Sequence, residues 1–393
     1  MDAQPTWSAP AYDFAGPRSV ASTDAGPSFF RSARWTPDGT AILTAGEDRL
    51  LRVHDLTHEE SGGIGLAQPR TFPQPDSVSA AQWYPSASRL VPETFCFVAS
   101  VRDAPVRLID ASDGRIRASY PIVDHRERFI APHSFAFNTA ADKLYCGFEN
   151  AIEVFDIASP GYDTGERLKL GLTRKEKGGQ RGIISALAFS AHHPTFAAGS
   201  FAGSVVLYDE DTRSAIAHVE GVEGGGVTQI AFHPLDPNVF FVASRRSEAI
   251  QPFDLRDTSA PVGRLARSGS TNQRLAFDVD PWGRWLASGD EFGTMRVWDI
   301  GSTHDVLFEQ KLHGDAMNSV QFHAYQPLLL TCAGSRAHLQ SPDIEFSSDE
   351  DTDSDSDSDS DDDDDDDVVE QSTVHVKTGA KDSRLAVWSF GQQ

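Results

Sequence analysis

The chain has 393 residues, 39% of them hydrophobic, and a formal net charge of −24. No run of about 18 apolar residues occurs, which excludes a membrane-spanning helix of ordinary length. Most of the charge lies between Ser341 and Glu370, where 17 residues are acidic and none is basic, so 41 acidic and 34 basic residues remain in a mildly acidic body.

Residues 1–27 form an N-terminal segment that precedes the repeats. Its first part, MDAQPTWSAPAYDFAG, is rich in Pro and Ala and has neither the basic region nor the apolar region of a secretory signal. Three widely spaced cysteines in apolar surroundings indicate free buried thiols rather than disulfides or a zinc site. We therefore expect an intracellular protein.

Residues 28–393 contain seven copies of one pattern. In each copy, a first strand leads into a turn, a second strand is rich in Ala and Ser, and a third strand ends in an apolar or aromatic residue followed by a polar one. The third strands are LLRVHDL, PVRLIDA, AIEVFDI, SVVLYDE, AIQPFDL, TMRVWDI and RLAVWSF, whose last polar residues are Asp55, Asp110, Asp156, Asp209, Asp254, Asp299 and Ser389. A period of about 45 residues with a Trp-Asp-like end is typical of a four-stranded propeller blade. We predict an all-β fold, a seven-bladed WD40 β-propeller.

The seventh copy is interrupted by the acidic segment. It separates LLLTCAG, Leu328 to Gly334, from RLAVWSF, and subtracting it restores the period. We predict a disordered insert at about residues 340–378, between the second and third strands of the last blade. No fourth strand follows, and an unpaired edge invites aggregation. Residues around Tyr12 to Val20 are therefore expected to supply the outer strand and close the ring.

The sequence carries no pattern typical of an enzyme. Its 13 histidines form neither an HExxH motif nor a Cys/His cluster with zinc spacing. Turn histidines such as His233 and His313 are expected to be structural. The sequence GVEGGGVT, residues 221–228, lacks the helix that follows a phosphate-binding loop. We predict a non-enzymatic, monomeric propeller without a bound metal or nucleotide cofactor.

Basic residues gather in the loops of one propeller face. The loop that enters a blade's first strand and the loop between its second and third strands lie on the same side, here called the top face. Arg binds phosphate and stacks on bases, while Asn and Gln read base edges, so we predict that this face binds single-stranded RNA. For any one arginine, the alternative is an ion pair that holds a loop. The candidate RNA contacts are Arg31, Arg128, Arg174, Lys175, Lys177, Arg181, Arg245, Arg246, Asn272, Gln273 and Arg274, with Arg34 and Arg126 in the same loops and the aromatic residues Trp83 and Tyr84 nearby.

Three large polar residues stand together in SGSTNQRLAFDVDP, residues 268–281. Asn272, Gln273 and Arg274 precede a short strand, and Gln and Arg do not supply the backbone freedom of a tight turn. They either meet an RNA loop or act as a structural pin whose amides satisfy neighbouring backbone groups.

The acidic stretch from Ser347 to Asp367 has three alternative roles: a solubilising loop, an internal competitor that suppresses non-specific RNA binding at the top face, or a binding site for basic partners such as histones. Its serines lie beside carboxylates, as acid-directed kinases require, and phosphorylation would add charge. The candidate phosphorylation sites are Ser347, Ser348, Ser354, Ser356 and Ser358.

Four stretches resemble the telomerase Cajal-body protein family, seven-bladed WD40 proteins that bind small RNAs. They are CFVASVRDAPVRLIDASDGRIRASY (96–120), KLYCGFENAIEVFDI (143–157), GIISALAFS (182–190) and TNQRLAFDVDPWGRWLASG (271–289). The resemblance covers nearly the whole propeller and the acidic interruption, but we expect this chain to lack the family's long N-terminal extension and C-terminal tail.

The resemblance implies an RNA chaperone that recognises a loop element of small Cajal-body RNAs (scaRNAs) and telomerase RNA and escorts the ribonucleoprotein in the nucleus. It implies H/ACA ribonucleoprotein proteins as partners, with spliceosomal RNA as a variant cargo. It also implies a nuclear location, in Cajal bodies or an equivalent site, with the cytoplasm as a further address. The alternative from another class is a protein-only WD40 interaction hub whose acidic tract binds basic partners, because most WD40 folds are protein hubs.

The competitor hypothesis for the acidic stretch has a direct test. Deleting residues 347–367 is expected to raise the affinity for unrelated RNA at low salt, because a tethered polyanion no longer competes for the basic loops. Fluorescence anisotropy with unrelated single-stranded RNA measures this affinity, and an unchanged dissociation constant would reject the hypothesis.

Overall fold

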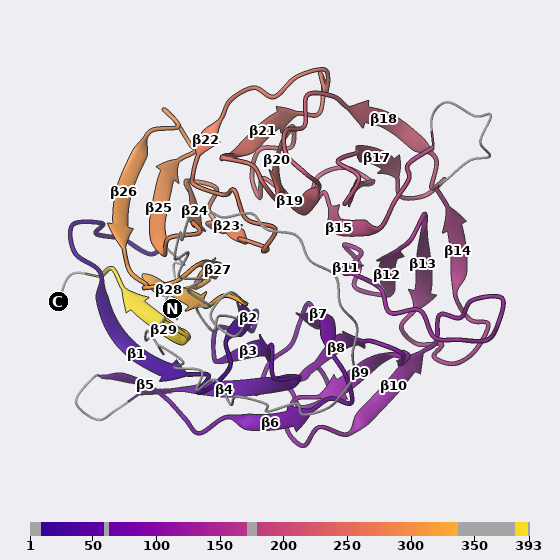
Figure 1. Cartoon of the computed structure of the whole chain (residues 1–393), viewed down its shortest axis with the longest axis horizontal. Coiled ribbons are helices and arrows are strands. Elements are labelled where there is room, and N and C mark those ends of the chain that lie inside the picture. The colour runs from indigo at the N-terminus through magenta and orange to yellow at the C-terminus, as the bar shows by residue number, and fades with distance from the viewer. Residues whose placement is uncertain (1–8, 59–62, 171–178, 337–381, 392–393) are drawn as a thin grey trace, which may run out of the picture.

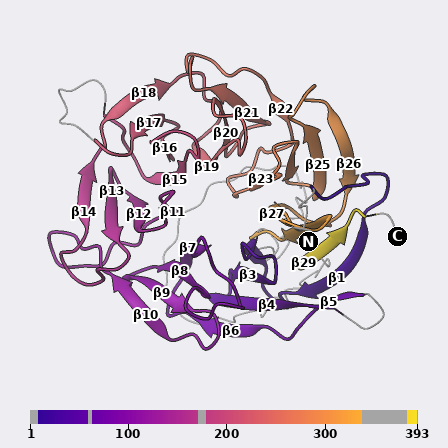
Figure 2. The ribbon, with the colours of Figure 1, turned by 180° about the vertical axis from the view of Figure 1, so that it is seen from behind.

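The computed structural model describes residues 9–58, 63–170, 179–336 and 382–391. Their strands form seven antiparallel sheets, arranged as the blades of a ring around a central opening (Figures 1 and 2). The predicted all-β, seven-bladed propeller is therefore confirmed. Within these ranges no helix has the length and apolar character needed to cross a membrane.

Blades one to three follow one another along the chain. Blade one contains β2 (Phe30–Trp35), β3 (Ala41–Gly46), β4 (Leu50–His58), β5 (Ile64–Leu66) and β6 (Arg70–Pro73), and both β5 and β6 pair with β4. Blade two contains β7 (Val78–Trp83), β8 (Cys96–Val101), β9 (Val106–Asp110) and β10 (Ile116–Tyr120). Blade three contains β11 (Ser134–Phe137), β12 (Lys143–Phe148), β13 (Ala151–Asp156) and β14 (Glu166–Lys169).

Blades four to seven continue the same order. Blade four contains β15 (Ile184–Phe189), β16 (Thr195–Ser200), β17 (Val205–Asp209) and β18 (Ala215–Val219), and blade five contains β19 (Val227–Phe232), β20 (Val239–Ser244), β21 (Ala249–Asp254) and β22 (Leu265–Ala266). Blade six contains β23 (Phe277–Val279), β24 (Trp285–Gly289), β25 (Thr294–Asp299) and β26 (Val306–Lys311). Blade seven combines β27 (Met317–Phe322), β28 (Leu328–Ala333) and β29 (Arg384–Ser389) with the N-terminal β1 (Arg18–Asp24).

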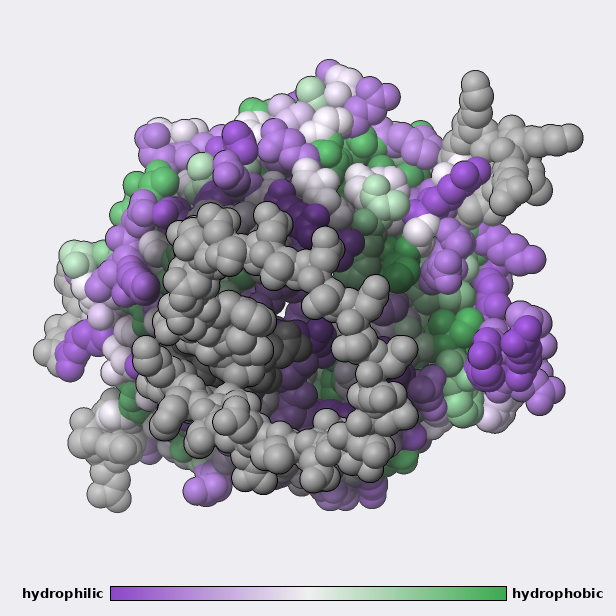
Figure 3. Space-filling view, in the orientation of Figure 1, coloured by the Kyte–Doolittle hydropathy of each residue, from purple (hydrophilic) through white to green (hydrophobic). Residues whose placement is uncertain are grey.

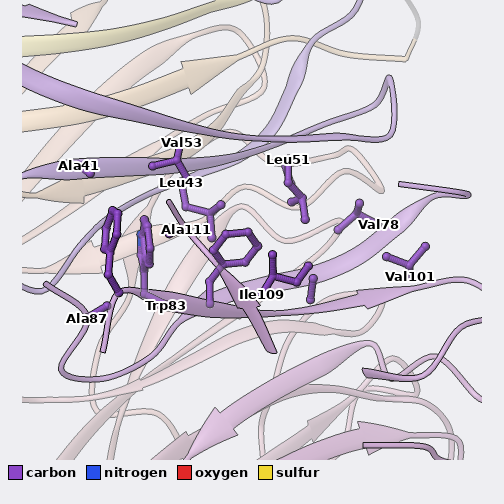
Figure 4. Close-up of a cluster of buried hydrophobic side chains, with 14 of the residues drawn as sticks. Ala41, Leu43, Leu51, Val53, Val78, Trp83, Ala87, Val101, Ile109 and Ala111 are labelled. Carbon is purple, nitrogen blue, oxygen red and sulfur yellow. The ribbon is translucent and has the colours of Figure 1, made fainter. Parts of the chain in front are cut away.

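The core lies between adjacent blades. Every residue of β8, sequence CFVASV, is buried, whereas the outer strand β18, sequence AIAHV, buries only its last residue. Continuous apolar runs are expected in strands that are covered on both faces. Between blades one and two, side chains such as Leu43, Trp83 and Ile109 interleave (Figure 4).

The three cysteines are buried and unpaired, as the sequence predicts. Burial raises the pKa of Cys96 to about 11 and also raises the pKa of Cys146 and of Cys332. Since the thiolate is the reactive form, these side chains behave as small apolar core groups.

The ring is closed by β1, which pairs antiparallel with β29 from Arg18 opposite Ser389 to Asp24 opposite Arg384. The N-terminal segment thus supplies the outer strand of blade seven, but the strand begins at Arg18 rather than at the expected Tyr12. The Tyr12 ring instead packs against Trp285 and Phe322, and its hydroxyl donates to the carbonyl of Leu328 at 3.2 Å. Aromatic packing, together with one backbone hydrogen bond from the Asp13 N–H to the Phe390 carbonyl, therefore holds the stretch before β1.

A buried chain of hydrogen bonds fixes blade seven. Trp388 Nε1 donates to Thr331 Oγ1 at 2.7 Å, and the same oxygen lies 2.7 Å from His313 Nε2. His313 Nδ1 lies 2.9 Å from an Asp382 carboxylate oxygen, which also accepts the Gly314 N–H. His313 therefore has a structural role, and the chain ties both strands that flank the acidic insert to the loop entering β27.

Replacing Asp382 by Asn is expected to lower the melting temperature at pH 7 by about 3–5 °C, because charge-assisted hydrogen bonds are lost. Although burial alone would raise it, the pKa of Asp382 is held well below its usual range by hydrogen bonds from His313, Arg384 and the Gly314 N–H. A depressed folded-state pKa stabilises the protein above the unfolded-state pKa of about 3.9, and this stabilisation is lost as the pH falls below it.

Thermal melting between pH 3 and 8 tests this expectation, with Asp211→Asn as an exposed control. The difference in melting temperature between wild type and Asp382→Asn should become smaller as the pH falls below about 4. A gap of constant size across the range contradicts the assignment.

Candidate functional site

The predicted basic loops open on one face of the ring. Arg31 lies at the start of β2, Arg128, Arg181 and Arg274 precede β11, β15 and β23, and the pair Arg245–Arg246 lies between β20 and β21. Because consecutive strands of a blade are antiparallel, all these positions fall on the top face. Arg174, Lys175, Lys177 and the candidate phosphorylation sites Ser347, Ser348, Ser354, Ser356 and Ser358 lie outside the described residues.

The expectation that Trp83 and Tyr84 accompany these residues is wrong. Strand β7 starts at the top face, so its final residue, Trp83, lies at the opposite end of the blade. Trp83 is 5% exposed, stacks on Phe95 and donates its Nε1 proton to the Arg34 carbonyl at 3.1 Å. Tyr84 packs in the next core cluster, with its hydroxyl donating to the Ala141 carbonyl at 3.3 Å. Both rings are part of the packing between blades.

Gln273 braces blade six against blade seven. Its amide nitrogen donates to Asn318 Oδ1 and, at 2.6 Å, to the Gly334 carbonyl. Asn318 Nδ2 in turn donates to the Phe30 carbonyl of blade one at 2.8 Å. The amide of Gln273 is therefore used inside the protein, which favours the structural pin for this residue.

Arg274 also makes internal contacts, but across the ring. Its Nη2 lies 3.2 Å from the His133 carbonyl, which precedes blade three, and 3.4 Å from the Ser185 carbonyl in blade four. Its guanidinium carbon is 5.5 Å from the centre of the Phe201 ring. Arg274 thus extends from blade six across the top of the central opening.

Arg245 stacks on the same aromatic ring. Its guanidinium carbon is 4.5 Å from the centre of the Phe201 ring, and its Nε donates to the Gly225 carbonyl at 3.0 Å. Two guanidinium groups therefore share Phe201, a residue that the sequence analysis missed. Its position in SFAGS, in the loop between the second and third strands of blade four, is the signal that places it on the top face.

Two of the predicted arginines form ion pairs with carboxylates of top-face loops. Arg128 pairs with Asp124 at 2.7 Å, and hydrogen bonds from the backbone N–H and the guanidinium of Arg128 lower the pKa of Asp124 to about 2. Arg31 Nε lies 3.4 Å from Glu47 Oε2, while its Nη1 donates to the Val78 carbonyl at 2.9 Å. These contacts hold loops, which is the alternative role considered for a single arginine.

Other polar side chains of the top face are exposed and make no hydrogen bond or ion pair with the rest of the described chain. They include Arg181, Arg246 and Asn272 from the predicted set, together with Arg126 and the unpredicted Arg102 between β8 and β9. Exposed carboxylates of the same kind also lie in top-face loops: Asp103, Glu127, Glu149 and Glu248. Phe292, between β24 and β25, adds an aromatic ring that is 60% exposed. Unpaired guanidinium groups and an exposed ring on one face suit phosphates and unstacked bases.

A shallow depression of about 480 Å³ lies between blades five and six, beside Arg246. Ser247, Glu248 and Ser270 contribute to its lining, as does the ion pair of Arg264 with Glu223 at 3.4 Å. Both signs of charge line it, and its two serine hydroxyls, those of Ser247 and Ser270, already donate to the Ala249 carbonyl and to Glu291.

Comparison with known proteins agrees with this architecture. The family described as "WD domain, G-beta repeat" matches residues 20–55 and 172–209. Telomerase Cajal body protein 1 of Homo sapiens is 36% identical over 333 residues, 82% of this chain and 59% of the relative, and that of Bos taurus is 34% identical over 333 residues, 82% of this chain and 60% of the relative. The chain therefore spans about 60% of the length of these relatives. "Guanine nucleotide-binding protein negative regulator 1" of Schizosaccharomyces pombe is 28% identical over 334 residues, 80% of this chain and 82% of the relative.

Neighbouring residues Gln273 and Asn272 provide a matched test of the pin. Gln273→Ala should lower the melting temperature by about 2–4 °C, because the buried Asn318 side chain and the Gly334 carbonyl lose a hydrogen-bond donor. Asn272→Ala should leave the melting temperature within about 1 °C of wild type, because its side chain is exposed and unbonded. Equal effects of the two substitutions on thermal melting would contradict the brace.

Proposed function

Because the chain belongs to the telomerase Cajal body protein 1 family, we propose that it is a non-enzymatic scaffold that binds a loop element of small nuclear RNA through its top face. The observation that carries the proposal is the presence of Arg181, Arg246 and Asn272 on one face, exposed and without partners among the described residues. On a mildly acidic body, such a face attracts a polyanion locally.

The chemistry of the face fits a single strand better than a duplex. An arginine guanidinium can donate two hydrogen bonds to the oxygens of one phosphate. The amide of Asn272 offers both a donor and an acceptor to the edge of a base. Phe292 presents a ring on which an unstacked base can lie. RNA loops and ends expose bases in this way, whereas the bases of a duplex are hidden.

The names of the relatives suggest which RNA this chain binds and where in the cell it acts. They concern telomerase and Cajal bodies, and we carry both to this chain as proposals: telomerase RNA or other H/ACA-type small RNAs as ligands, H/ACA ribonucleoprotein proteins as partners, and a nuclear site of action. Spliceosomal RNA is a variant cargo of the same scaffold.

A protein-only hub is the second candidate, favoured by one comparison. The Schizosaccharomyces pombe relative, matched over most of its length, is named for a guanine nucleotide-binding protein rather than for an RNA. In this alternative, the propeller binds proteins, and the acidic tract binds basic partners. The two candidates differ in their salt dependence, because phosphate contacts release counterions.

Charge reversal separates the RNA scaffold from the hub in vitro. Arg181→Glu combined with Arg246→Glu is expected to weaken single-stranded RNA binding at least tenfold and to reduce the slope of log Kd against log salt by about 1.4. The control is Arg115→Glu combined with Arg256→Glu, the same change of charge in the loops of the opposite face. Both residues form ion pairs, with Asp110 and Asp254, so thermal melting first checks that this variant is folded. Equal weakening in both double variants would show that net charge, not the top face, governs binding.

Crosslinking in cells, followed by sequencing of the retained RNA, identifies the cargo. Enrichment of a small set of H/ACA-type or spliceosomal RNAs, lost in the Arg181→Glu and Arg246→Glu double variant, is the expected result. A library no different from background in wild type would instead favour the protein hub.

A further inference from the structure

Four arginines lie around the central channel at different depths, and we refer to them as the channel cluster. Arg31 and Arg34 come from β2, the innermost strand of blade one, Arg245 from blade five and Arg274 from the loop that enters blade six. The charges of Arg31, Arg34 and Arg245 all act on Arg274, which itself reaches carbonyls of blades three and four. Hydrophilic side chains border part of this opening in Figure 3.

The channel cluster holds more positive than negative charge. Burial, reinforced by the three like charges, lowers the pKa of Arg274 to about 10. Glu47 faces Arg31 but also pairs with Arg336 at 2.8 Å. Asp278 acts on Arg34, yet burial raises the pKa of Asp278 to about 7, so near neutrality it is only partly ionised. Like charges held together in an enclosed place disfavour the empty site.

Much of the hydrogen-bonding capacity of the channel cluster is unused. The side chain of Arg34 is accessible to solvent in the channel, yet the surrounding protein lowers its pKa by burial. It has no hydrogen bond or ion pair among the described residues. Arg245 uses its Nε, and Arg274 its Nη2, which leaves further N–H groups on each guanidinium. An enclosed cationic donor that lacks an acceptor is costly, whereas a phosphate supplies several acceptors and the missing charge.

The aromatic ring between two of the arginines fixes their orientation. Phe201 lies 4.5 Å from the guanidinium carbon of Arg245 and 5.5 Å from that of Arg274. Stacking of this kind restricts the guanidinium planes, so little side-chain freedom remains to be lost when an anion binds.

We propose that the channel cluster is a phosphate-binding site in which Arg34, Arg245 and Arg274 together hold one phosphate group inside the channel, below its mouth. The phosphate belongs either to the backbone of a bound RNA strand or to a free polyphosphate. The first source rests on the proposed function, and the second does not. In the first case, the channel anchors one nucleotide while Arg181, Arg246 and Asn272 contact the strand around it.

Arg34→Gln tests the site in the full-length protein, because this side chain has no partner in the described chain whose loss would unfold the blade. Inorganic pyrophosphate is the first probe, read by thermal melting. It is expected to raise the wild-type melting temperature by about 2 °C at saturating concentration, and to lose this effect in Arg34→Gln. Arg115→Gln, on the opposite face, should retain the shift.

Single-stranded oligouridylate is the second probe, read by fluorescence anisotropy over a range of salt. Arg34→Gln is expected to weaken its binding about fivefold and to lower the slope of log Kd against log salt by about 0.7, one phosphate contact. Arg115→Gln should leave both quantities unchanged.

The two probes separate the sources. Arg34-dependent effects on both probes, or on the RNA alone, assign the site to a strand phosphate. An Arg34-dependent pyrophosphate shift without RNA binding by wild type supports a free polyphosphate and rejects the RNA scaffold. The channel site is overturned if pyrophosphate still raises the melting temperature of Arg34→Gln. It is also overturned if pyrophosphate shifts neither protein and Arg34→Gln binds RNA with the affinity and salt slope of wild type. If wild type responds to neither probe, both proposals fail.

Discussion

Closure of the ring by β1 and β29 is the constraint on which the other features depend. This pairing joins residues 18–24 to residues 384–389, near the two ends of the chain. First strands are also linked directly around the channel: Ser134 Oγ donates to the Ile184 carbonyl, and Asn318 Nδ2 to the Phe30 carbonyl, both at 2.8 Å. The Asn318 bond spans the junction of the last and first blades. The brace at Gln273 and the arginines of β2 therefore keep their relative positions only in a closed ring.

The repeat carried most of the information about the backbone. The Trp-Asp-like ends gave the number of blades, and the doubled last period correctly joined LLLTCAG to RLAVWSF, now β28 and β29. The predicted bounds of the closing strand were less accurate. Tyr12 and Phe14 are aromatic, as strand residues often are, but they pack against other aromatic rings. Local pattern cannot distinguish these two kinds of burial, since both place apolar side chains against a core.

Side-chain partners were harder to anticipate than positions. The repeat correctly assigned Gln273, Arg274 and Arg245 to top-face loops, but it does not reveal that Gln273 bonds Asn318 or that Arg274 reaches blades three and four. These contacts join residues up to 141 positions apart and depend on the ring geometry. The prediction that Trp83 lies on the top face was wrong for a different reason. Nearness in sequence to a basic loop does not say at which end of a strand a residue lies.

The two faces of the propeller differ in the kind of partner that they suit. Exposed large apolar residues such as Leu90, Leu235 and Trp282 lie in loops between first and second strands, on the face opposite the free arginines. Protein interfaces favour aromatic and apolar anchors with few charges at their centre, whereas phosphate recognition favours unpaired guanidinium groups. Apart from Phe292 on the top face, these exposed apolar residues and the free arginines therefore lie on opposite faces of the propeller. A partner protein on the apolar face would leave the top face and the channel mouth open to an anionic strand, so the two functions do not compete for the same residues.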